Sequence, residues 1–312
     1  MRRMAYRHPT KKVARIRIAG PDKKGIIAAV TGYLSENNCN IEDIDQRILD
    51  DFLIMNMLVD ISDLKKPLPL FLKGLRTAAD RVGTEAEFKS VEKKAIKNVG
   101  ILVTKEAHCL VDLLKKMKQS EGQRLPLKGK PVVIIGNYPY LEPIAKNYKV
   151  PFFLVPSENR KQHEQKVLEL LARFDVDLVV LARYMQILSP DFVFRHEGRI
   201  INIHPSLLPA FPGPRAYHQA YNKGVEIVGV TAHFVTTDLD EGPIITQGCF
   251  RVDKTRDTVE KFIARGRRLE ADVLTRAVKM FLDNRLFLRR GKVIDSKKMR
   301  ALQEKTKEFY DK

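Results

Sequence analysis

Residues 177–204 read DLVVLARYMQILSPDFVFRHEGRIINIH, two short apolar runs separated by a segment that contains Ser189 and Pro190. The first run, 177–182, stays apolar after its first residue, which is typical of a strand buried on both faces of a sheet. The second run, 200–204, is similar in length but includes two polar residues. This stretch predicts two strands of a mostly parallel sheet.

Upstream, the same rhythm begins at Val99, where short apolar runs alternate with segments of helical spacing. The runs are VGILVT, VVIIG and PFFLV, and the segments that follow them are CLVDLLKKM, YLEPIAKNY and NRKQHEQKVLELLARF. This alternation predicts βαβ units, and hence a Rossmann-like, mostly parallel, doubly wound α/β domain.

Downstream, residues 224–235 and 243–252 have strand character and are expected to pair with each other. Residues 258–282 predict a long helix, 285–294 a terminal hairpin, and 295–312 a charged helical tail.

The first ninety residues follow a different pattern. Residues 13–19 predict a strand, a breaker cluster ends at Gly25, and residues 26–36 have apolar side chains at helical spacing. Two further strands, a helix and a last strand are expected at 40–49, 52–61, 67–81 and 86–91. The resulting βαββαβ order is that of a ferredoxin-like unit.

A length of 312 residues favours two domains. We expect a ferredoxin-like domain at 10–90, a linker at 91–98, the larger α/β domain at 99–294 and the charged tail at 295–312.

Composition excludes several classes of protein. Hydrophobic residues make up 44% of the chain, and no run approaches the roughly 20 apolar residues of a membrane-spanning helix. The N-terminus lacks the apolar run of a signal peptide. Cys39, Cys109 and Cys249 are far apart and form no CxxC pair, so we expect no disulfide framework, no zinc-thiolate site and a cytoplasmic location.

The net charge of +18 is concentrated at the two ends. Residues 1–20 carry seven basic and no acidic residues, and residues 284–312 carry ten basic and four acidic ones. Such ends are typical of solvated tails, and the same field can attract a polyanion. No basic motif with interleaved aromatic residues appears, so a nucleic-acid partner is not favoured.

Polar residues gather after two predicted strands, where ligands bind in doubly wound sheets. Asn202 and His204 alternate along a strand and therefore share one face. An amide can hold an oxyanion and an imidazole can move a proton, which suits acyl chemistry. Asp240, within 238–243, can orient the imidazole or accept a proton from the nucleophile. Each of the three also has a simpler interpretation as a turn or core residue.

A metal site is not expected, and neither is a phosphate site built from backbone amides. The histidines have no metal-ligand spacing, and the pair His108 and Cys109 has no further ligand nearby in the sequence. Residues 104–108, after the first strand of the larger domain, contain no glycine. Backbone N–H groups need glycine there to approach a phosphate, which argues against a phosphate-bearing substrate bound by backbone amides and leaves one bound by Lys105 open.

Three separated blocks then point to a known family. They are NIHPSLLP at 202–209, GVTAHFV at 229–235 and DLDEGPII at 238–245. In order and spacing they resemble the formyltransferase family that uses 10-formyltetrahydrofolate, and the resemblance covers residues 99–294.

A second resemblance concerns the N-terminal unit. Residues 13–90 resemble an ACT domain, through PDKKG at 21–25 and the βαββαβ order. An ACT unit before such a domain is the arrangement of the formyltetrahydrofolate deformylases, and HCLVDLL at 108–114 and AYHQAY at 216–221 are similar to that subgroup.

The resemblance implies a catalytic triad of Asn202, His204 and Asp240. Water would attack the formyl carbon of 10-formyltetrahydrofolate and release formate and tetrahydrofolate, with no cofactor besides this substrate. The order in which Asp240 and His204 take the first proton stays open. The folate would lie against Tyr184, Met185, Gln186, Ile187, Leu188, Thr237, Asp238 and Leu239.

The same triad serves formyl transfer to an amine such as glycinamide ribonucleotide. Such transferases have a glycine-rich phosphate loop that residues 104–108 lack, whereas Pro205 matches the transferases, because deformylases commonly have a second histidine there. Methionyl-tRNA formyltransferase is a further alternative. The basic ends would favour binding of tRNA, but the ACT-like unit before the larger domain argues against this enzyme. A sensor or RNA-binding protein on a retired scaffold would have no need of all three triad residues.

The ACT resemblance also implies partners for the N-terminal unit. We expect a homo-oligomer, a dimer or tetramer, and an amino-acid effector such as glycine or methionine near Asp22 and Gly25. A plain dimerisation module is the alternative, and no membrane partner is expected.

Overall fold

The computed structural model describes residues 12–49, 51–90, 96–118, 127–211, 213, 216–252, 258–289 and 291–296. The chain divides into two compact units, Met1–Lys94 and Ala95–Lys312, and each is described by itself. Parts of the expected linker (91–95) and of the expected charged tail (297–312) lie outside the described residues, as do the basic residues 1–11. In the part of the chain that is described, no helix is long and apolar enough to cross a membrane.

The N-terminal unit is a four-stranded antiparallel sheet in the order β2-β3-β1-β4, with two helices. Strand β1 alternates between buried and partly exposed residues because one face of the sheet packs against the helices. The observed order confirms the predicted βαββαβ unit. Its elements are β1 (Val13–Pro21), α1 (Ile26–Glu36), β2 (Asn40–Leu49), β3 (Phe52–Asp60), α2 (Leu68–Arg81) and β4 (Glu85–Ser90).

The C-terminal unit is built on a seven-stranded sheet in the order β11-β10-β9-β8-β5-β6-β7. Strands β5 to β9 pair in parallel, and β10 and β11 continue the sheet in antiparallel pairing. The strands are β5 (Lys97–Val103), β6 (Gly129–Gly136), β7 (Phe152–Leu154), β8 (Leu178–Ala182), β9 (Ile200–His204), β10 (Ile227–Phe234) and β11 (Ile244–Arg251).

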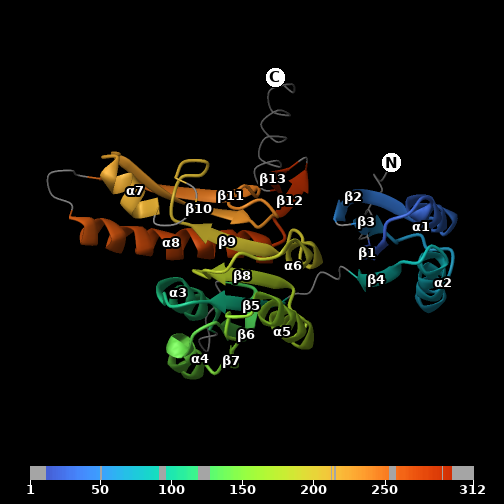
Figure 1. The fold of residues 1–312 in the computed structure, drawn as a ribbon, viewed down its shortest axis with the longest axis horizontal. Coiled ribbons are helices and arrows are strands. Elements are labelled where there is room, and N and C mark those ends of the chain that lie inside the picture. The colour runs from blue at the N-terminus through green and yellow to red at the C-terminus, as the bar shows by residue number, and fades with distance from the viewer. Residues whose placement is uncertain are drawn as a thin grey trace, which may run out of the picture. The chain divides into compact units, whose positions relative to one another are not determined.

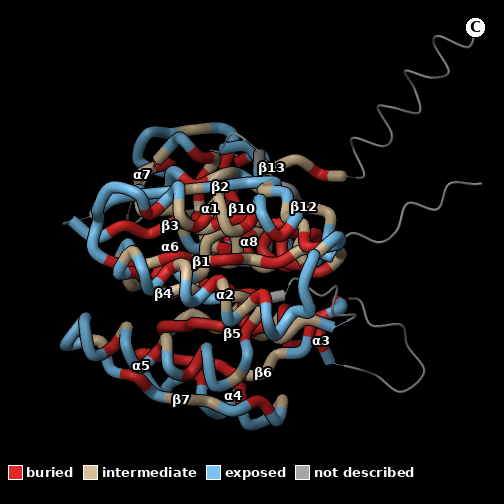
Figure 2. Tube along the Cα trace, turned by 90° about the vertical axis from the view of Figure 1, so that its right-hand side faces the viewer, coloured by how far each residue is buried: buried red, intermediate tan, exposed pale blue. Residues whose placement is uncertain are grey.

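Helices cover both faces of this sheet (Figure 1). Residues of α3, α4 and α8 pack against one face, and residues of α5 and α6 against the other. Strand β8 is therefore buried at every residue and β5 from Val99 onward, and such buried segments are red in Figure 2. The helical elements are α3 (His108–Met117), η1 (Pro139–Leu141), α4 (Glu142–Asn147), α5 (Arg160–Arg173), α6 (Pro190–Arg195), α7 (Ala216–Asn222) and α8 (Val259–Leu282).

The alternation of apolar runs correctly predicted the α/β class and the parallel strands. A hairpin of β12 (Leu286–Arg289) and β13 (Lys292–Asp295) also forms where it was expected. Helix α7 was not anticipated, since only seven residues form it and the sequence before it looks like an extended loop.

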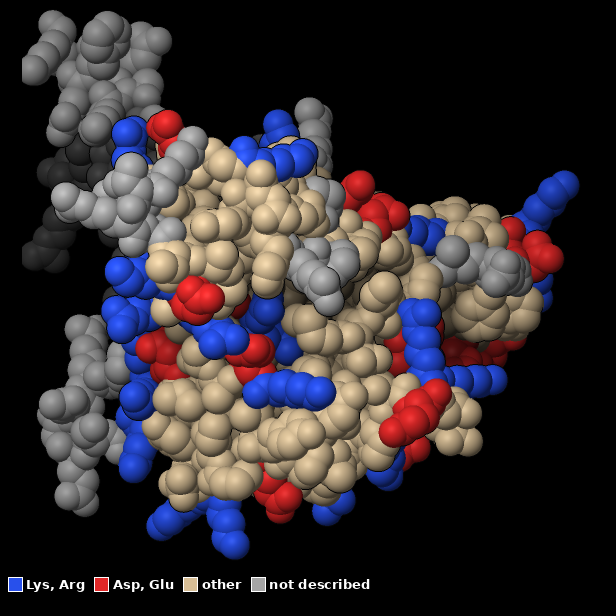
Figure 3. Space-filling view, turned by 60° about the vertical axis from the view of Figure 1, so that its left-hand side comes forward, with Lys and Arg blue, Asp and Glu red and all other residues tan. Residues whose placement is uncertain are grey.

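The strand order explains why the polar residues at the end of β9 lie at the edge of the sheet where ligands bind. It reverses at β5, which lies between β6 and β8, so the switch point opens at the carboxyl ends of β5 and β8. Strand β9 is the next strand after β8, and its carboxyl end carries His204. In the middle of the face seen in Figure 3, acidic and basic side chains lie interspersed.

Candidate active site

Asn202 and His204 come from the last residues of β9, and Asp240 comes from the loop that follows β10. His204 Nδ1 lies 3.2 Å from Asp240 Oδ2. The side chain of His204 is 6% exposed and that of Asp240 is 7% exposed, so the pair is largely shielded from water. The structure thus brings the imidazole and the carboxylate together and places the Asn202 amide on the same strand, two residues away.

The loop that carries Asp240 depends on an unusual backbone. Asp240 has a φ of 59°, in the left-handed region that aspartate tolerates better than most residues. Two residues later, a Cβ on Gly242 would lie 1.7 Å from the carbonyl oxygen of Phe234. Glycine is therefore required there for the loop to turn back against the end of β10. The amide of Gly213 donates a hydrogen bond of 3.3 Å to Asp240 Oδ2 and fixes the carboxylate further.

Both ring nitrogens of His204 face acceptors. Nδ1 faces Asp240, and Nε2 lies 3.0 Å from the carbonyl oxygen of Phe211. A doubly protonated imidazole has an N–H for each, whereas a neutral ring has only one. An N–H on either nitrogen can therefore donate a hydrogen bond, from Nδ1 to Asp240 or from Nε2 to the carbonyl of Phe211.

The electrostatics of Asp240 match this arrangement. Burial opposes ionisation of the carboxyl, but the hydrogen bond and the charge of His204 outweigh burial, so the pKa of Asp240 lies below its usual value. Asp240 is thus a carboxylate at neutral pH.

His233 is a site residue that the sequence reasoning missed. It lies directly opposite Asn202 in the antiparallel pairing of β10 with β9. Its Nδ1 lies 2.9 Å from the carbonyl oxygen of Phe234, and its Nε2 lies 3.3 Å from Asn202 Nδ2 and 3.8 Å from Asp240 Oδ1. In the sequence, His233 was visible only as the histidine of GVTAHFV. The pairing of β10 with β9 was needed to show that it lies beside Asn202.

The protonation of His233 follows from these contacts. Burial lowers the pKa of His233, which keeps the ring neutral at physiological pH. With Nδ1–H donating to Phe234, Nε2 is left as an acceptor for the Asn202 amide. His233 therefore fixes which way the Asn202 amide points, with its nitrogen toward β10.

Thr231 and Gln247 hold the loop that follows His204. The Thr231 hydroxyl donates to the carbonyl of Ser206 at 2.7 Å and accepts from the amide of Leu208 at 3.0 Å. Gln247 Nε2 donates to the Thr231 hydroxyl at 2.9 Å and to the carbonyl of Leu208 at 3.2 Å. These contacts fix the course of the chain between His204 and Phe211.

The residues expected to hold folate differ in their exposure. Met185, Ile187 and Leu239 are 57%, 62% and 57% exposed, which leaves three large apolar side chains at the surface of the segments after β8 and β10. Tyr184 is instead buried, and its hydroxyl is hydrogen-bonded to His163. Of the remaining four, Gln186, Leu188 and Thr237 are partly buried and Asp238 is exposed.

Lys105, left open as a phosphate ligand, lies over aromatic rings. Its Nζ is 4.4 Å from the ring centroid of Tyr138 and 5.8 Å from that of Tyr140, which is cation–π geometry. The two rings are themselves stacked.

Asp22 and Gly25, expected to bind an effector, line a pocket of about 390 Å³ in the N-terminal unit. Gly25 has a φ of 95° and directly precedes α1. Lys23, Lys24, Gln46 and apolar residues of α1 and β3 complete the lining.

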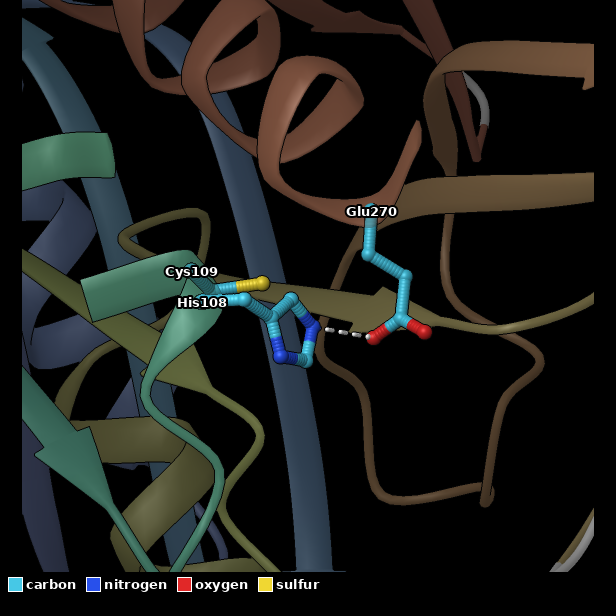
Figure 4. Close-up of side chains that lie close together, drawn as sticks. All are labelled: His108, Cys109 and Glu270. Carbon is cyan, nitrogen blue, oxygen red and sulfur yellow. Dashed lines mark hydrogen bonds and ion pairs between the residues drawn. The ribbon is translucent and has the colours of Figure 1, made fainter. Parts of the chain in front are cut away.

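Among the described residues, one group has metal-ligand character: His108, Cys109 and Glu270, whose ligand atoms lie within 4.8 Å of one another (Figure 4). Glu270 is the further residue that sequence spacing did not reveal, because it lies on α8. Arg183 Nε lies 3.3 Å from Glu270 Oε2, and a guanidinium at that distance opposes a bound cation.

Comparisons with known proteins agree with the fold. Residues 97–278 match the model of the formyl transferase family, and residues 14–89 match that of the ACT domain. A formyltetrahydrofolate deformylase of Bacillus subtilis is 37% identical over 294 residues, which cover 93% of this chain and 95% of the relative.

Solved structures give the same result. A formyltetrahydrofolate deformylase of Pseudomonas syringae has a TM-score of 0.61 and 31% identity, and the match covers 93% of this chain and 96% of that one. A glycinamide ribonucleotide transformylase of Symbiobacterium toebii has a TM-score of 0.60 and 32% identity, but that match covers only 64% of this chain. Since the similarity to the deformylases includes the N-terminal unit, the chain belongs to the formyltetrahydrofolate deformylase family, whose larger domain is a formyl transferase domain and whose smaller one is an ACT domain.

Proposed function

We propose that the chain hydrolyses 10-formyltetrahydrofolate to formate and tetrahydrofolate, with Asn202, His204 and Asp240 as its catalytic residues. The observation that carries the proposal is the buried His204–Asp240 pair beside an amide whose direction is fixed by His233. The reaction needs water, the substrate and these side chains.

The folate enters over the apolar residues after β8 and β10. Met185, Ile187 and Leu239 are exposed here, and a pterin ring would cover them and remove their apolar surface from water. Tyr184 holds this segment through the hydrogen bond between its hydroxyl and His163.

The formyl oxygen is held by Asn202 and His204. Asn202 keeps one N–H on His233 and turns the other toward the substrate. His204 Nε2–H now donates to the carbonyl of Phe211, and the formyl oxygen takes the place of that carbonyl when the substrate binds. Two donors then face the oxygen on which negative charge develops, which is the largest catalytic contribution expected in acyl chemistry.

Water attacks the formyl carbon and forms a tetrahedral intermediate. Asp240 stabilises the charged His204 through Oδ2, and Oδ1 accepts a proton from the attacking water. The bond between the formyl carbon and the folate nitrogen breaks, and the nitrogen takes up the proton from Asp240. Formic acid is released and loses its remaining proton to solvent as formate.

The test is release of formate and tetrahydrofolate from 10-formyltetrahydrofolate by the purified chain without any acceptor amine. We expect turnover that is not increased by glycinamide ribonucleotide. Release of tetrahydrofolate only when an amine is added, with the formyl group recovered on that amine and not as formate, would replace hydrolysis by formyl transfer. Absence of both reactions, with and without glycine or methionine as activators, would contradict the proposal.

For the ACT unit we propose binding of a small amino acid in the pocket beside Asp22 and Gly25, within a homo-oligomer. An α-ammonium and an α-carboxylate match the Asp22 carboxylate and the ammonium groups of Lys23 and Lys24, which line this pocket. Calorimetry of the full chain with glycine and methionine is expected to show binding that the variant Asp22→Ala weakens at least about tenfold. Equal heats for the variant and the unchanged chain would contradict this site.

A further inference from the structure

Residues 184–189, which we call the β8–α6 segment, lie in neither a helix nor a strand. The hydrogen bonds of a helix or a sheet therefore do not fix the course of this segment. It carries Met185 and Ile187, two of the exposed apolar side chains on which the folate is expected to lie. The position of this surface consequently depends on side chains that neighbouring elements supply.

The β8–α6 segment begins beside the strand that carries the proposed catalytic residues. Strand β8 pairs in parallel with β9, and Leu181 lies opposite Asn202 in that pairing. The amide of Met185 donates a hydrogen bond of 2.9 Å to the hydroxyl of Thr104, which directly follows β5. The segment is thus tied to the end of β5 at the switch point of the sheet, next to the strand that holds Asn202 and His204.

Helix α5 holds the start of the segment through His163. Its ring is stacked on the ring of Tyr184 with centroids 6.1 Å apart, and its Nε2 is hydrogen-bonded to the Tyr184 hydroxyl. On the other side of the ring, Nδ1 lies 3.0 Å from the carbonyl oxygens of Val155 and Pro156, which follow β7. Because carbonyls only accept, Nδ1 carries a hydrogen, and Nε2 of the neutral ring accepts from the phenol.

The next residue of α5, Glu164, holds the end of the segment. Its Oε1 accepts a hydrogen bond of 2.7 Å from the amide of Ser189. Ser189 is also the N-cap of α6, where its hydroxyl accepts a hydrogen bond of 3.2 Å from the amide of Phe192. Arg160 Nε lies 3.6 Å from the same Glu164 oxygen. Two consecutive residues of one helix therefore fix both ends of the β8–α6 segment.

Burial makes the contact of Tyr184 with His163 a specific one. Both side chains are buried. Burial, followed by the nearby charge of Glu164, raises the pKa of Tyr184, so its hydroxyl stays protonated and needs an acceptor. A buried hydroxyl without a partner is costly, which favours the one arrangement in which it reaches His163. With Tyr184 and Ser189 both held, the residues between them have little freedom, and this keeps Met185 and Ile187 at the surface.

We propose that His163 and Glu164 are positioning residues for the substrate, which hold the β8–α6 segment in its folate-binding conformation before the folate arrives. A surface that is already ordered binds more tightly, because the entropy of ordering is lost during folding and not during binding. The inference rests on the proposed folate site, since both residues act through that segment. Their loss is therefore expected to raise KM and to leave kcat nearly unchanged, the pattern of an interaction that is equal in ground state and transition state.

A double-mutant cycle on formate release tests the role of His163. Tyr184→Phe and His163→Leu each remove one partner of the hydrogen bond and keep a side chain of similar bulk. Each is expected to raise KM for 10-formyltetrahydrofolate about fivefold or more and to change kcat less than about twofold. The double variant should stay within about twofold of the larger single effect, because both changes remove the same contact.

Three outcomes of this cycle overturn the role of His163. The first is a KM of Tyr184→Phe within about twofold of the unchanged chain, the second is a fall of kcat with an unchanged KM, and the third is a double variant whose KM effect is the product of the single effects. If His163→Leu fails to fold, Tyr184→Phe alone decides, since it removes a single oxygen atom.

The role of Glu164 is tested by comparing two substitutions. Glu164→Ala removes the acceptor of the Ser189 amide and should raise KM about fivefold or more. Glu164→Gln keeps an oxygen for that amide and should restore KM to within about twofold of the unchanged chain. Both remove the charge that faces Arg160, so this charge does not distinguish them. Lost stability alone would not give this split, because KM does not depend on how much of the enzyme is folded.

The matched control is Glu169→Ala, which removes an exposed carboxylate from the same helix and should leave both constants unchanged. An equal rise of KM in Glu164→Ala and Glu164→Gln, or no rise in either, overturns the role of Glu164.

Calorimetry with tetrahydrofolate, the expected product, separates this inference from the proposed function, because binding of the product needs no catalysis. We expect its Kd to rise about fivefold or more in Tyr184→Phe and Glu164→Ala, and to stay within about twofold in Glu164→Gln and Glu169→Ala. This pattern without any formate release would contradict the hydrolase function alone. An equal Kd in all variants, or no binding by the unchanged chain, overturns the positioning role.

Discussion

Replacement of Asp240 by asparagine is expected to reduce formate release by roughly 10²–10⁴-fold, the usual contribution of a general base. The side chain keeps its size and can still contact His204, but it loses the charge that stabilises the protonated ring and the oxygen that accepts a proton from water. The measurement is kcat for formate release under saturating 10-formyltetrahydrofolate. A matched control is Glu241→Gln, which removes a neighbouring carboxylate whose side chain is exposed in the same loop.

The same variant also tests the charge state of Asp240 through the pH dependence of stability. The pKa of Asp240 is lowered in the folded chain, so its carboxylate stabilises the fold fully above the ordinary aspartate pKa of about 3.9. That contribution is lost as the pH falls through the lowered value. We therefore expect the Tm difference between the unchanged chain and Asp240→Asn to be constant at neutral pH and to shrink below about pH 4. A difference that grows in acid would contradict the assigned charge state, and an unchanged kcat would contradict the catalytic role.

Asn202→Ala is expected to lower kcat by about 10²–10³-fold while changing KM little, because the amide donates mainly to the oxygen that becomes negative in the transition state. The folate is held by the separate apolar surface of Met185, Ile187 and Leu239, which the variant leaves intact. Steady-state kinetics of formate release give both constants.

Asn222→Ala serves as its control, since it removes an exposed amide at the end of α7. An increase of KM without a decrease of kcat would mean that Asn202 contributes to substrate binding and not to stabilisation of the reacting oxygen. If Asn202→Ala and Asn222→Ala have equal kcat and KM, Asn202 is not a residue of the active site.

The proposed catalytic residues could be selected from the sequence because their arrangement is mostly local. Side chains two residues apart in a strand always share a face, so Asn202 and His204 had to lie together once 200–204 was recognised as a strand. The alternation of strand and helix likewise follows from apolar periodicity within short windows. Asp240 needed the family resemblance, since its residue type and the neighbouring Gly242 fit a simple turn equally well.

Other features depended on contacts between distant parts of the chain. His233 reaches Asn202 only through the antiparallel register of β10 on β9, and a register shift of one residue would turn it to the opposite face. Tyr184 belongs to a segment expected to bind folate, yet its hydroxyl is buried against His163 from α5.

The sequence by itself therefore determined the two units, the α/β class and the shared face of Asn202 and His204, because periodicity and alternation act between near neighbours. Only the tertiary structure decided that His233 orients an amide and that Glu270 lies beside His108, although 162 residues separate the latter two. The physical reason is that a buried charge is stable only where its partners converge, and no local pattern records which helix will supply the carboxylate.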